Sequence, residues 1–351
     1  MSLPVLSPLF GWLVGDVKAR TILVHGRDQP VGDGFLQAGF FHALRCRFPK
    51  SHITFAVSKG GSPYDGSLRA VMAPFIDEVL SDQGFCMEPR QLSPLASRPL
   101  GGRQFDLVID LEKKFWRSLA VKRVRHRIFI SASRHFLFSD RWPRQWKNPA
   151  HLSDQYMLLL DAIGMPKHLD LPAPDFHDSK CDDFARRLLP DGKVYVGLAP
   201  GAGDRGKCWP LDRYYALSRL LLSRNVQPVY LLGPQEKDWV QLVADAVPDA
   251  LIPAWKDGRM LPEFTCPLQT VALGHRLAAA VTNDCGIAHM LAAAQTPLVT
   301  LFGYTNAIKY APLTPHLKTI TAQDYGSKSV SAIPLDAVVA ALDDLHVPGI
   351  S

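Results

Sequence analysis

The chain has 351 residues, of which 47% are hydrophobic and 21% are charged, a composition typical of a globular protein long enough for two domains. No apolar run approaches the roughly 20 residues of a membrane-spanning helix. The N-terminus lacks a basic segment and its short apolar run contains Pro4 and Pro8, which argues against a secretory signal. The six cysteines are scattered without a CxxC pair. This pattern favours reduced thiols in the cytoplasm over a zinc site or a disulfide framework.

The net charge is +6, and its distribution is uneven. Residues 113–147 contain eleven lysines and arginines but only one acid, Asp140. Such a segment indicates an anionic partner, which could be a phosphorylated substrate, an acidic lipid surface or a nucleic acid. Seven aromatic residues within it suit a membrane interface as well as a nucleic acid. A solvated basic surface is the plain alternative, and the absence of an RNA-binding motif disfavours RNA.

The first half of the chain predicts alternating strands and helices. After an extension at 1–20, a strand at 21–24 is followed by a helix at 35–48 and a strand at 53–57. Val-Gly-Asp occurs twice, but only Asp33 lies between a strand and a helix, at a strand's carboxyl end. The alternation then continues through a helix at 68–75, strands at 106–110 and 127–130, and a helix at 156–163.

A proline-rich stretch at 166–174 predicts a domain boundary, after which the pattern restarts. We expect an α/β protein with two facing doubly wound, Rossmann-like domains and the ligand between them. The predicted units are 1–170, 175–332, and a C-terminal helix and tail at 333–351. The elements expected in the second half are helices at 181–189, 211–224, 236–247, 268–276 and 335–345 and strands at 194–198 and 226–232.

The stretch 281–312 predicts one βαβ unit. In it a polar turn, 283–286, lies between the first strand and a helix of small residues. This turn would lie at the carboxyl end of a parallel strand, where open α/β sheets bind ligands. The following helix would point its N–H groups at a bound phosphate. Asp284 and His289 could both reach that crevice. They could equally be a helix cap and a structural histidine.

The loop 199–210 carries three glycines and Lys207 between a strand and a helix, which suits phosphate binding. It is not a Walker A loop, because Cys208 follows the lysine. A formal GxGxxG match at 201–206 lacks the acidic residue that a dehydrogenase places after its next strand. Glu236 could accept hydrogen bonds from a ribose or complement a helix dipole. A mobile glycine loop with an exposed lysine is the alternative.

The order of these motifs is specific as a set. It comprises Val31-Gly-Asp33, Pro-Gly-Ala202, Lys207-Cys-Trp-Pro210, Leu-Leu-Gly-Pro-x-Glu236, Asn-Asp-Cys-Gly-x-x-His289 and Leu-Phe-Gly-Tyr-Thr305. Over about residues 21–345 the chain resembles the ADP-heptose:lipopolysaccharide heptosyltransferases of glycosyltransferase family 9. It departs from their pattern at Cys285, where threonine is usual, at Gly203, where a hydroxyl residue is frequent, and at Tyr304, where proline is common.

This resemblance implies a GT-B fold and an inverting, metal-independent glycosyltransferase. Such an enzyme would move a heptose or related sugar from a nucleotide-diphosphate sugar, with ADP-heptose as the expected donor, to a lipopolysaccharide-core or other glycan acceptor. No cofactor or metal is implied. Asp33 would be the catalytic base and Lys207 would stabilise the departing diphosphate. The donor-binding residues implied are Gly201, Ala202, Glu236, Asp284, Cys285, Gly286 and His289.

The N-terminal domain would bind the acceptor. Candidates are Gly32 and Gly34 beside Asp33, and Arg123, Arg125 and Arg127, which alternate along a strand-like run and would share one side of it. The basic segment would face an anionic glycolipid or glycan, which predicts a cytoplasmic monomer peripheral to the inner face of the membrane and no nucleic-acid partner.

Two other classes remain open from the residues. The changes at Cys285 and Gly203 fit a nucleotide-sugar or phosphoglycan binding protein without catalysis. A nicotinamide oxidoreductase is a more distant alternative. Turnover of a nucleotide sugar that depends on a glycan acceptor would separate these classes from a transferase.

Overall fold

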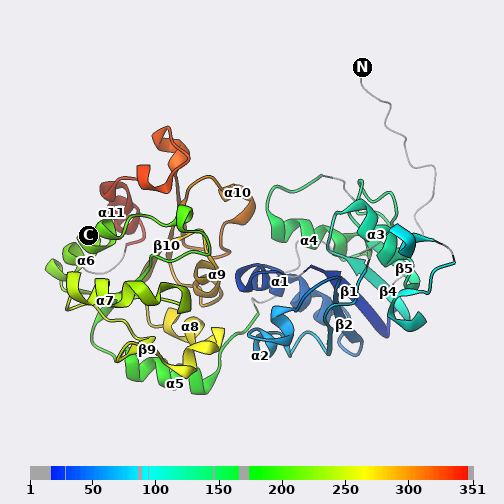
Figure 1. Cartoon of the computed structure of the whole chain (residues 1–351), viewed down its shortest axis with the longest axis horizontal. Helices are drawn as coiled ribbons and strands as arrows, with labels where there is room; N and C mark the ends of the chain where they lie inside the picture. Colours follow the sequence, from blue (N-terminus) through cyan, green and yellow to red (C-terminus); the bar gives the residue numbers. More distant parts are fainter. Residues whose placement is uncertain are drawn as a thin grey trace.

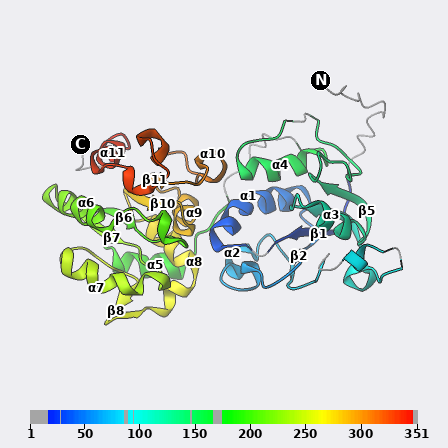
Figure 2. The same ribbon diagram turned by 45° about the horizontal axis from the view of Figure 1, so that its top comes forward.

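The computed structural model describes residues 17–346, apart from 28, 86–88, 94, 145–146 and 166–173. It shows two α/β lobes side by side, the N-lobe (17–165) and the C-lobe (174–346) (Figure 1). Helices α1 and α9 lie where the lobes meet, and the same arrangement is visible in the turned view (Figure 2). The expected extension and domain boundary lie largely outside the described residues.

The N-lobe contains a parallel five-stranded sheet in the order β3-β2-β1-β4-β5. The strand order reverses between β1 and β4, so ligand-binding loops are expected at the carboxyl ends of these two strands. Its strands are β1 (Thr21–Gly26), β2 (His52–Val57), β3 (Glu78–Leu80), β4 (Gln104–Asp110) and β5 (Arg125–Ser131). Its helices are α1 (Val31–Arg47), α2 (Arg69–Met72), α3 (Phe115–Lys122) and α4 (Leu152–Asp161).

The C-lobe repeats this architecture with the order β12-β11-β10-β6-β7, and its switch point lies between β10 and β6. The sheet strands are β6 (Val194–Ala199), β7 (Val226–Tyr230), β10 (Ala279–Asn283), β11 (Leu298–Phe302) and β12 (Leu317–Thr321), and β8 (Trp255–Lys256) and β9 (Arg259–Met260) form a hairpin. The helices are α5 (Ser179–Leu188), α6 (Leu211–Ser223), α7 (Lys237–Ala246), α8 (Pro267–Gly274), α9 (Gly286–Ala293), α10 (Ala307–Tyr310) and α11 (Leu335–Asp343).

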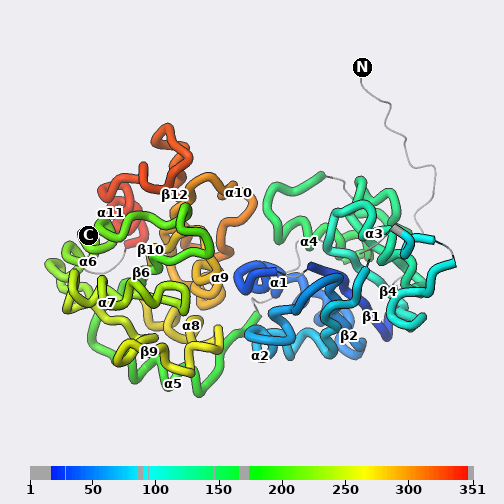
Figure 3. Tube along the Cα trace, viewed as in Figure 1, coloured from blue at the N-terminus to red at the C-terminus, as the bar shows by residue number. Residues whose placement is uncertain are grey.

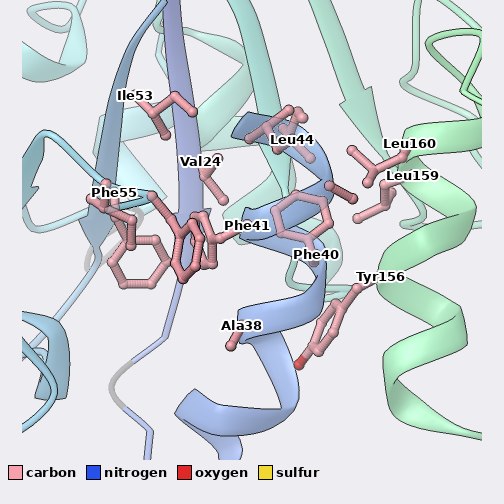
Figure 4. Packing of buried hydrophobic residues seen from close by; sticks show 14 of the residues in the cluster. Val24, Ala38, Phe40, Phe41, Leu44, Ile53, Phe55, Tyr156, Leu159 and Leu160 are labelled. Atoms are coloured by element: carbon pink, nitrogen blue, oxygen red, sulfur yellow. The ribbon is translucent and has the colours of Figure 1, made fainter. Parts of the chain in front are cut away.

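Helix α1 forms the centre of the N-lobe core. Its side chains Phe40, Phe41 and Leu44 are buried between the β1–β2 face and helix α4 (Figure 4). Full burial of one such side chain contributes about 2 kcal/mol through the hydrophobic effect. The same apolar cluster continues into α8 and the end of α9 through Val271 and Ala294, so α1 also holds the two lobes together.

A buried polar network fixes the switch point of the N-lobe sheet. The ring of His25, at the end of β1, lies 2.8 Å from Asp110 at the end of β4 and 2.8 Å from the Ser58 hydroxyl. The other carboxylate oxygen of Asp110 accepts hydrogen bonds from Ser118 and Ser131. Because all five side chains are buried, this network sets the geometry of the strand ends next to the site.

The tube representation shows the two lobes from the same side, with α11 beside α6 and β12 in the C-lobe (Figure 3). Helix α11 packs on α6, β11 and β12, so the C-terminal segment belongs to the C-lobe core. A second contact between the lobes is the His151 ring, at the start of α4, which lies 3.0 Å from the carbonyl oxygen of Ala311.

The prediction of two facing doubly wound sheets is confirmed. Sequence reasoning missed β3, β12, the β8–β9 hairpin and α10, all of which are short. It also placed Arg123 wrongly, because β5 begins at Arg125 and Arg123 is the C-cap residue of α3. None of the described helices is both long and apolar enough to cross a membrane.

Candidate functional site

The first turns of α1 and α9 are in contact across the lobes. A Cβ atom added to Gly32 would lie 2.8 Å from the Cα of Gly286 and 3.0 Å from the His289 ring. A side chain at residue 32 would therefore push the lobes apart. This contact places Asp33, in the first turn of α1, opposite the polar turn that precedes α9.

Lys207 and Asp284 form an ion pair at the carboxyl edge of the C-lobe sheet. The Lys207 amine donates to a carboxylate oxygen of Asp284 at 2.8 Å, and both side chains are largely shielded from solvent. Burial opposes the charge of Lys207, but the bond to Asp284 and the nearby Tyr304 and Asp204 outweigh it and raise the pKa of the lysine. Lys207 is therefore an ammonium at neutral pH, and two of its three donors are still available to a ligand.

Asn283 connects the loop 200–209 to the turn 283–286, and no sequence motif indicated this role. Its side-chain oxygen accepts the backbone N–H of Trp209 at 3.1 Å, and its amide donates to the carbonyl of Pro200 at 2.7 Å. The side chain is fully buried. Asn283 therefore holds the loop that carries Lys207 against the turn that carries Asp284.

Glu236 and Gly201 are in close contact. The Glu236 carboxylate accepts the backbone N–H of Gly233 at 3.0 Å, and its other oxygen lies where a Cβ on Gly201 would stand. Glu236 is buried, and this burial raises the pKa of its carboxyl above the ordinary value. Only glycine at position 201 leaves room for Glu236 in this position.

An apolar cavity of about 220 Å³ is lined by Gly233, whose N–H binds Glu236. It lies between the end of β7, the β8–β9 hairpin and α9, and its walls include Leu232, Gly233, Met260 and Ile287. A flat ring with few polar atoms fits such walls, because apolar pockets with a few polar groups at the rim are typical of cofactor and nucleotide sites. The sequence did not reveal this cavity.

His289 and Cys285 carry no charge in this site. Burial, with a smaller effect of nearby His151, lowers the pKa of His289 to about 4 against the attraction of Asp284. Burial raises the pKa of the Cys285 thiol to about 12. Positive charge at this turn must therefore come from Lys207 and from the N-terminus of α9, whose dipole and free N–H groups favour anions.

The turn after β11 also approaches this site. The Tyr304 hydroxyl donates to Asp204 at 2.6 Å, and the Lys207 amine lies 5.9 Å from the centre of the Tyr304 ring. Gly203, beside it, has open space where a Cβ would stand. Ala202 is buried under the loop.

Asp33 lies at the entrance to a second cavity, in the N-lobe. Arg27 donates to the Asp33 carboxylate at 3.1 Å and also lines this cavity of about 260 Å³. The cavity lies at the carboxyl ends of β1, β4 and β5 and is closed on one side by Lys309 and Tyr310 of the C-lobe. Asp33 therefore has one cavity on its own lobe and the Lys207–Asp284 pair across from it.

The structure does not place the other expected acceptor residues beside Asp33 or the N-lobe cavity. Arg125 and Arg127 begin β5 at the amino end of the sheet, opposite the edge that carries the cavity, and Arg123 binds the carbonyls of Gln91 and Ala96. Gly34 faces Tyr64 and Leu68, where a Cβ would collide, so it serves packing within the N-lobe.

One group of side chains in the described ranges has the spacing of metal ligands. It consists of His177, Asp182 and His275, near the start of α5 and the end of α8. The two rings stack with 4.1 Å between their centres, and both lie near the Asp182 carboxylate. These residues lie outside the loops that carry Lys207 and Asp284.

The family model described as glycosyltransferase family 9 (heptosyltransferase) matches residues 96–333 of this chain. Lipopolysaccharide heptosyltransferase 3 of Escherichia coli is 23% identical over 266 residues, which cover 70% of this chain and 76% of that protein. Two doubly wound lobes with facing carboxyl edges form the GT-B fold, and the family model adds that the chain is a sugar-transferring enzyme with this fold. The chain belongs to glycosyltransferase family 9, the heptosyltransferase family.

Solved structures show the same fold. A family 9 glycosyltransferase from Veillonella parvula superposes with a TM-score of 0.70 at 22% identity and covers 93% of this chain and 97% of its own. The Escherichia coli heptosyltransferase WaaC with ADP gives a TM-score of 0.65 at 15% identity, covering 93% of this chain and 99% of its own. These likenesses extend across both lobes.

The neutral state of His289 predicts an acid-dependent loss of stability. The pKa of about 4 lies below that of an unfolded histidine, so the stabilising effect is complete above about pH 6.5 and is lost as the pH falls toward 4. Between pH 7 and pH 5, we expect the free energy of unfolding of the wild type to fall by about 2 kcal/mol more than that of His289→Gln. Urea unfolding of both proteins at the two pH values measures this difference. Equal losses would contradict the assignment of a neutral buried histidine.

Proposed function

We propose that the protein is an inverting, metal-independent heptosyltransferase that moves a heptose from a nucleotide-diphosphate sugar to an acceptor of the lipopolysaccharide core. The observation that carries this proposal is the position of Asp33 across the lobe contact from the Lys207–Asp284 pair and the N-terminus of α9. A proton acceptor and an anion site then lie on opposite sides of one cleft. The relatives' names and the ADP in the WaaC structure support the choice of heptose and ADP.

The donor would extend along the carboxyl edge of the C-lobe sheet. The apolar cavity of about 220 Å³ would hold the base, and Glu236 at its rim would accept hydrogen bonds from the ribose hydroxyls. The diphosphate would lie between Lys207 and the first N–H groups of α9, beginning at Gly286. Asp284 would bind hydroxyls of the sugar, which then faces the N-lobe.

The reaction would proceed by direct displacement. The acceptor hydroxyl oxygen attacks the anomeric carbon from the N-lobe side, and Asp33 takes up the hydroxyl proton. The bond from the anomeric carbon to the diphosphate breaks on the opposite side, which inverts the configuration. The nucleoside diphosphate leaves with the bonding electrons, and Lys207 and the α9 N-terminus stabilise its charge, each well-placed donor contributing about 3 kcal/mol.

A patch of exposed aromatic and basic residues adjoins the N-lobe cavity. Trp116, Leu137 and Trp142 are each about 60% exposed, and Arg134 and Arg144 are exposed beside them. The patch lies on α3 and on the loop after β5, and the residues just before them, Lys114 and Ala132, line the cavity. We propose that this patch contacts an anionic membrane surface, so that a lipid-linked acceptor reaches Asp33 directly.

Replacing Asp33 by asparagine tests the catalytic base. We expect Asp33→Asn to lose turnover by a factor of about a hundred or more, because the amide cannot accept the hydroxyl proton. ADP affinity, measured by calorimetry, should stay within about twofold of the wild-type value, because Asp33 lies on the other lobe. Asp65→Asn, an exposed N-lobe carboxylate, is the matched control and should keep full turnover.

Retained turnover in Asp33→Asn would overturn the role of this residue. If the wild type binds ADP but transfers no sugar to any core acceptor, the alternative of a non-catalytic nucleotide-sugar binding protein stands instead.

Two glycines of one loop test the donor site. Gly201→Ala should displace Glu236 and weaken ADP binding at least about tenfold, the loss expected when a hydrogen bond to a charged group is removed. Gly203→Ala adds the same methyl group in open space and should leave ADP affinity unchanged. Calorimetric titration with ADP measures both. Equal affinities in the two variants would mean that Glu236 does not contact the nucleotide.

The membrane patch predicts lipid binding that depends on its tryptophans. The double variant Trp116→Ala/Trp142→Ala should bind vesicles containing phosphatidylglycerol at least about tenfold more weakly than the wild type. Both tryptophan side chains, and their apolar contact with the lipid, are then absent. Leu242→Ala, an exposed apolar residue of the C-lobe, is the control. Co-sedimentation measures the bound fraction, and unchanged binding in the double variant would exclude this patch as the contact.

A further inference from the structure

Three polar side chains of the C-lobe meet where helices α5 and α8 pack against each other (Figure 1). They are His177, just before α5, Asp182 in the first turn of α5, and His275, directly after α8. One possible metal-ligand atom of each residue lies within 4.8 Å of the other two. The proposed sugar transfer uses none of the three, so their grouping needs another explanation.

The Asp182 carboxylate faces both histidine rings. One of its oxygens lies 3.1 Å from Nδ1 of His177, and the other lies 3.5 Å from Nδ1 of His275. Zinc binds imidazole nitrogen and carboxylate oxygen at about 2.0–2.2 Å, so two ligands of a tetrahedral zinc ion are about 3.4 Å apart. The observed nitrogen–oxygen distances are therefore close to those around such an ion.

The segment that contains these residues is acidic. Residues 175–183 include four aspartates and a single lysine. Among the residues that the structure describes, neither Asp175 nor Asp182 forms an ion pair with a lysine or an arginine. Asp175 instead accepts the backbone N–H of His177 at 2.9 Å. The negative charge that remains here favours a divalent cation, and imidazole nitrogen together with carboxylate oxygen is a ligand set of zinc.

One ring has to turn before the two histidines can share an ion. The ring planes are 19° apart and the ring centres 4.1 Å apart, whereas the lone pair of an imidazole nitrogen lies in the plane of its own ring. The His177 side chain is 62% exposed and the His275 side chain only 23%. His177 is therefore the ring that can rotate about its Cβ–Cγ bond, while His275 and Asp182 stay in place.

His177 belongs to a segment that contacts both lobes. The residue before it, Phe176, is buried against Phe35 of α1, with 5.6 Å between the ring centres. His177 itself stacks on His275 at the end of α8. An ion bound by His177, Asp182 and His275 would connect this segment to α5 and α8, directly beside its contact with the N-lobe.

We propose that His177, Asp182 and His275 bind a zinc ion, which fixes the start of the C-lobe next to α1. Three protein ligands leave one tetrahedral position for water. The role of the ion is structural, because His275 precedes β10 whereas Asp284 follows the other end of this strand. The inference does not depend on the proposed function, in which no metal takes part in the transfer.

Metal titrations of the full-length protein test this site. After treatment with EDTA and removal of the chelator, the wild type should bind one Zn²⁺ per chain in a calorimetric titration at neutral pH. Co²⁺, as a spectroscopic probe, should give visible absorption stronger than that of hydrated Co²⁺, and Zn²⁺ should remove it. His177→Gln and His275→Gln should each bind Zn²⁺ at least about tenfold more weakly, since even residues that only support a metal ligand contribute that much.

A control variant separates this site from other histidines of the surface. His316→Gln removes an exposed histidine elsewhere on the C-lobe and should bind Zn²⁺ as the wild type does. Zn²⁺ should also raise the Tm of the wild type but not that of His177→Gln, whose exposed side chain makes misfolding an unsuitable explanation. The proposal is overturned if the wild type binds no stoichiometric Zn²⁺, or if both variants bind it as tightly as the wild type.

Discussion

The contact between the first turns of α1 and α9 determines how the two lobes meet. Gly32 and Gly286 approach so closely that a Cβ on residue 32 would lie 2.8 Å from the Cα of Gly286. Both helices begin at this contact, so the positive ends of two helix dipoles converge on one region. Two carboxylates, Asp33 and Asp284, lie beside these ends, and each is paired with a cation, Arg27 for Asp33 and Lys207 for Asp284.

The two lobes contribute different charged groups to the region around this contact. The C-lobe supplies a permanent cation, Lys207, and two neutral groups, His289 and Cys285, whose pKa values burial displaces away from neutrality. The N-lobe supplies the carboxylate of Asp33, which accepts a hydrogen bond from Arg27. The buried network around His25 and Asp110 keeps the strand ends beneath Asp33 in register.

Much of this architecture follows from the sequence because buried parallel strands form continuous apolar runs with helices between them. The motifs around Lys207, Glu236 and Asp284 were predicted for the same reason, since each follows the carboxyl end of such a strand. Short edge elements escaped prediction. Strand β12 is only half buried and α10 is a single turn, so neither produces a clear hydrophobic period.

Features that depend on the approach of the two lobes could not be read from sequence. Asn283 resembles any turn residue until its bonds to Trp209 and Pro200 are seen. The alternation of Arg123, Arg125 and Arg127 favoured a shared face, but α3 ends at the first of them and β5 starts at the second. Lys309 carries no motif, and its place in the wall of the N-lobe cavity is a property of the assembled lobes.

The packing of α11 on its own lobe bears on how such enzymes could be recombined. Each sheet is complete within one lobe and the C-terminal helix stays with the C-lobe, but the apolar cluster of α1 continues into α8 and α9, so the two lobes share part of their core. A chimera with a foreign N-lobe would keep the loops of Lys207, Glu236 and Asp284 intact, but the new lobe would have to match the apolar surface of α8 and α9. It would also keep Lys309 and Tyr310 of the C-lobe in the wall of the N-lobe cavity, so a foreign N-lobe would not bring a complete cavity with it.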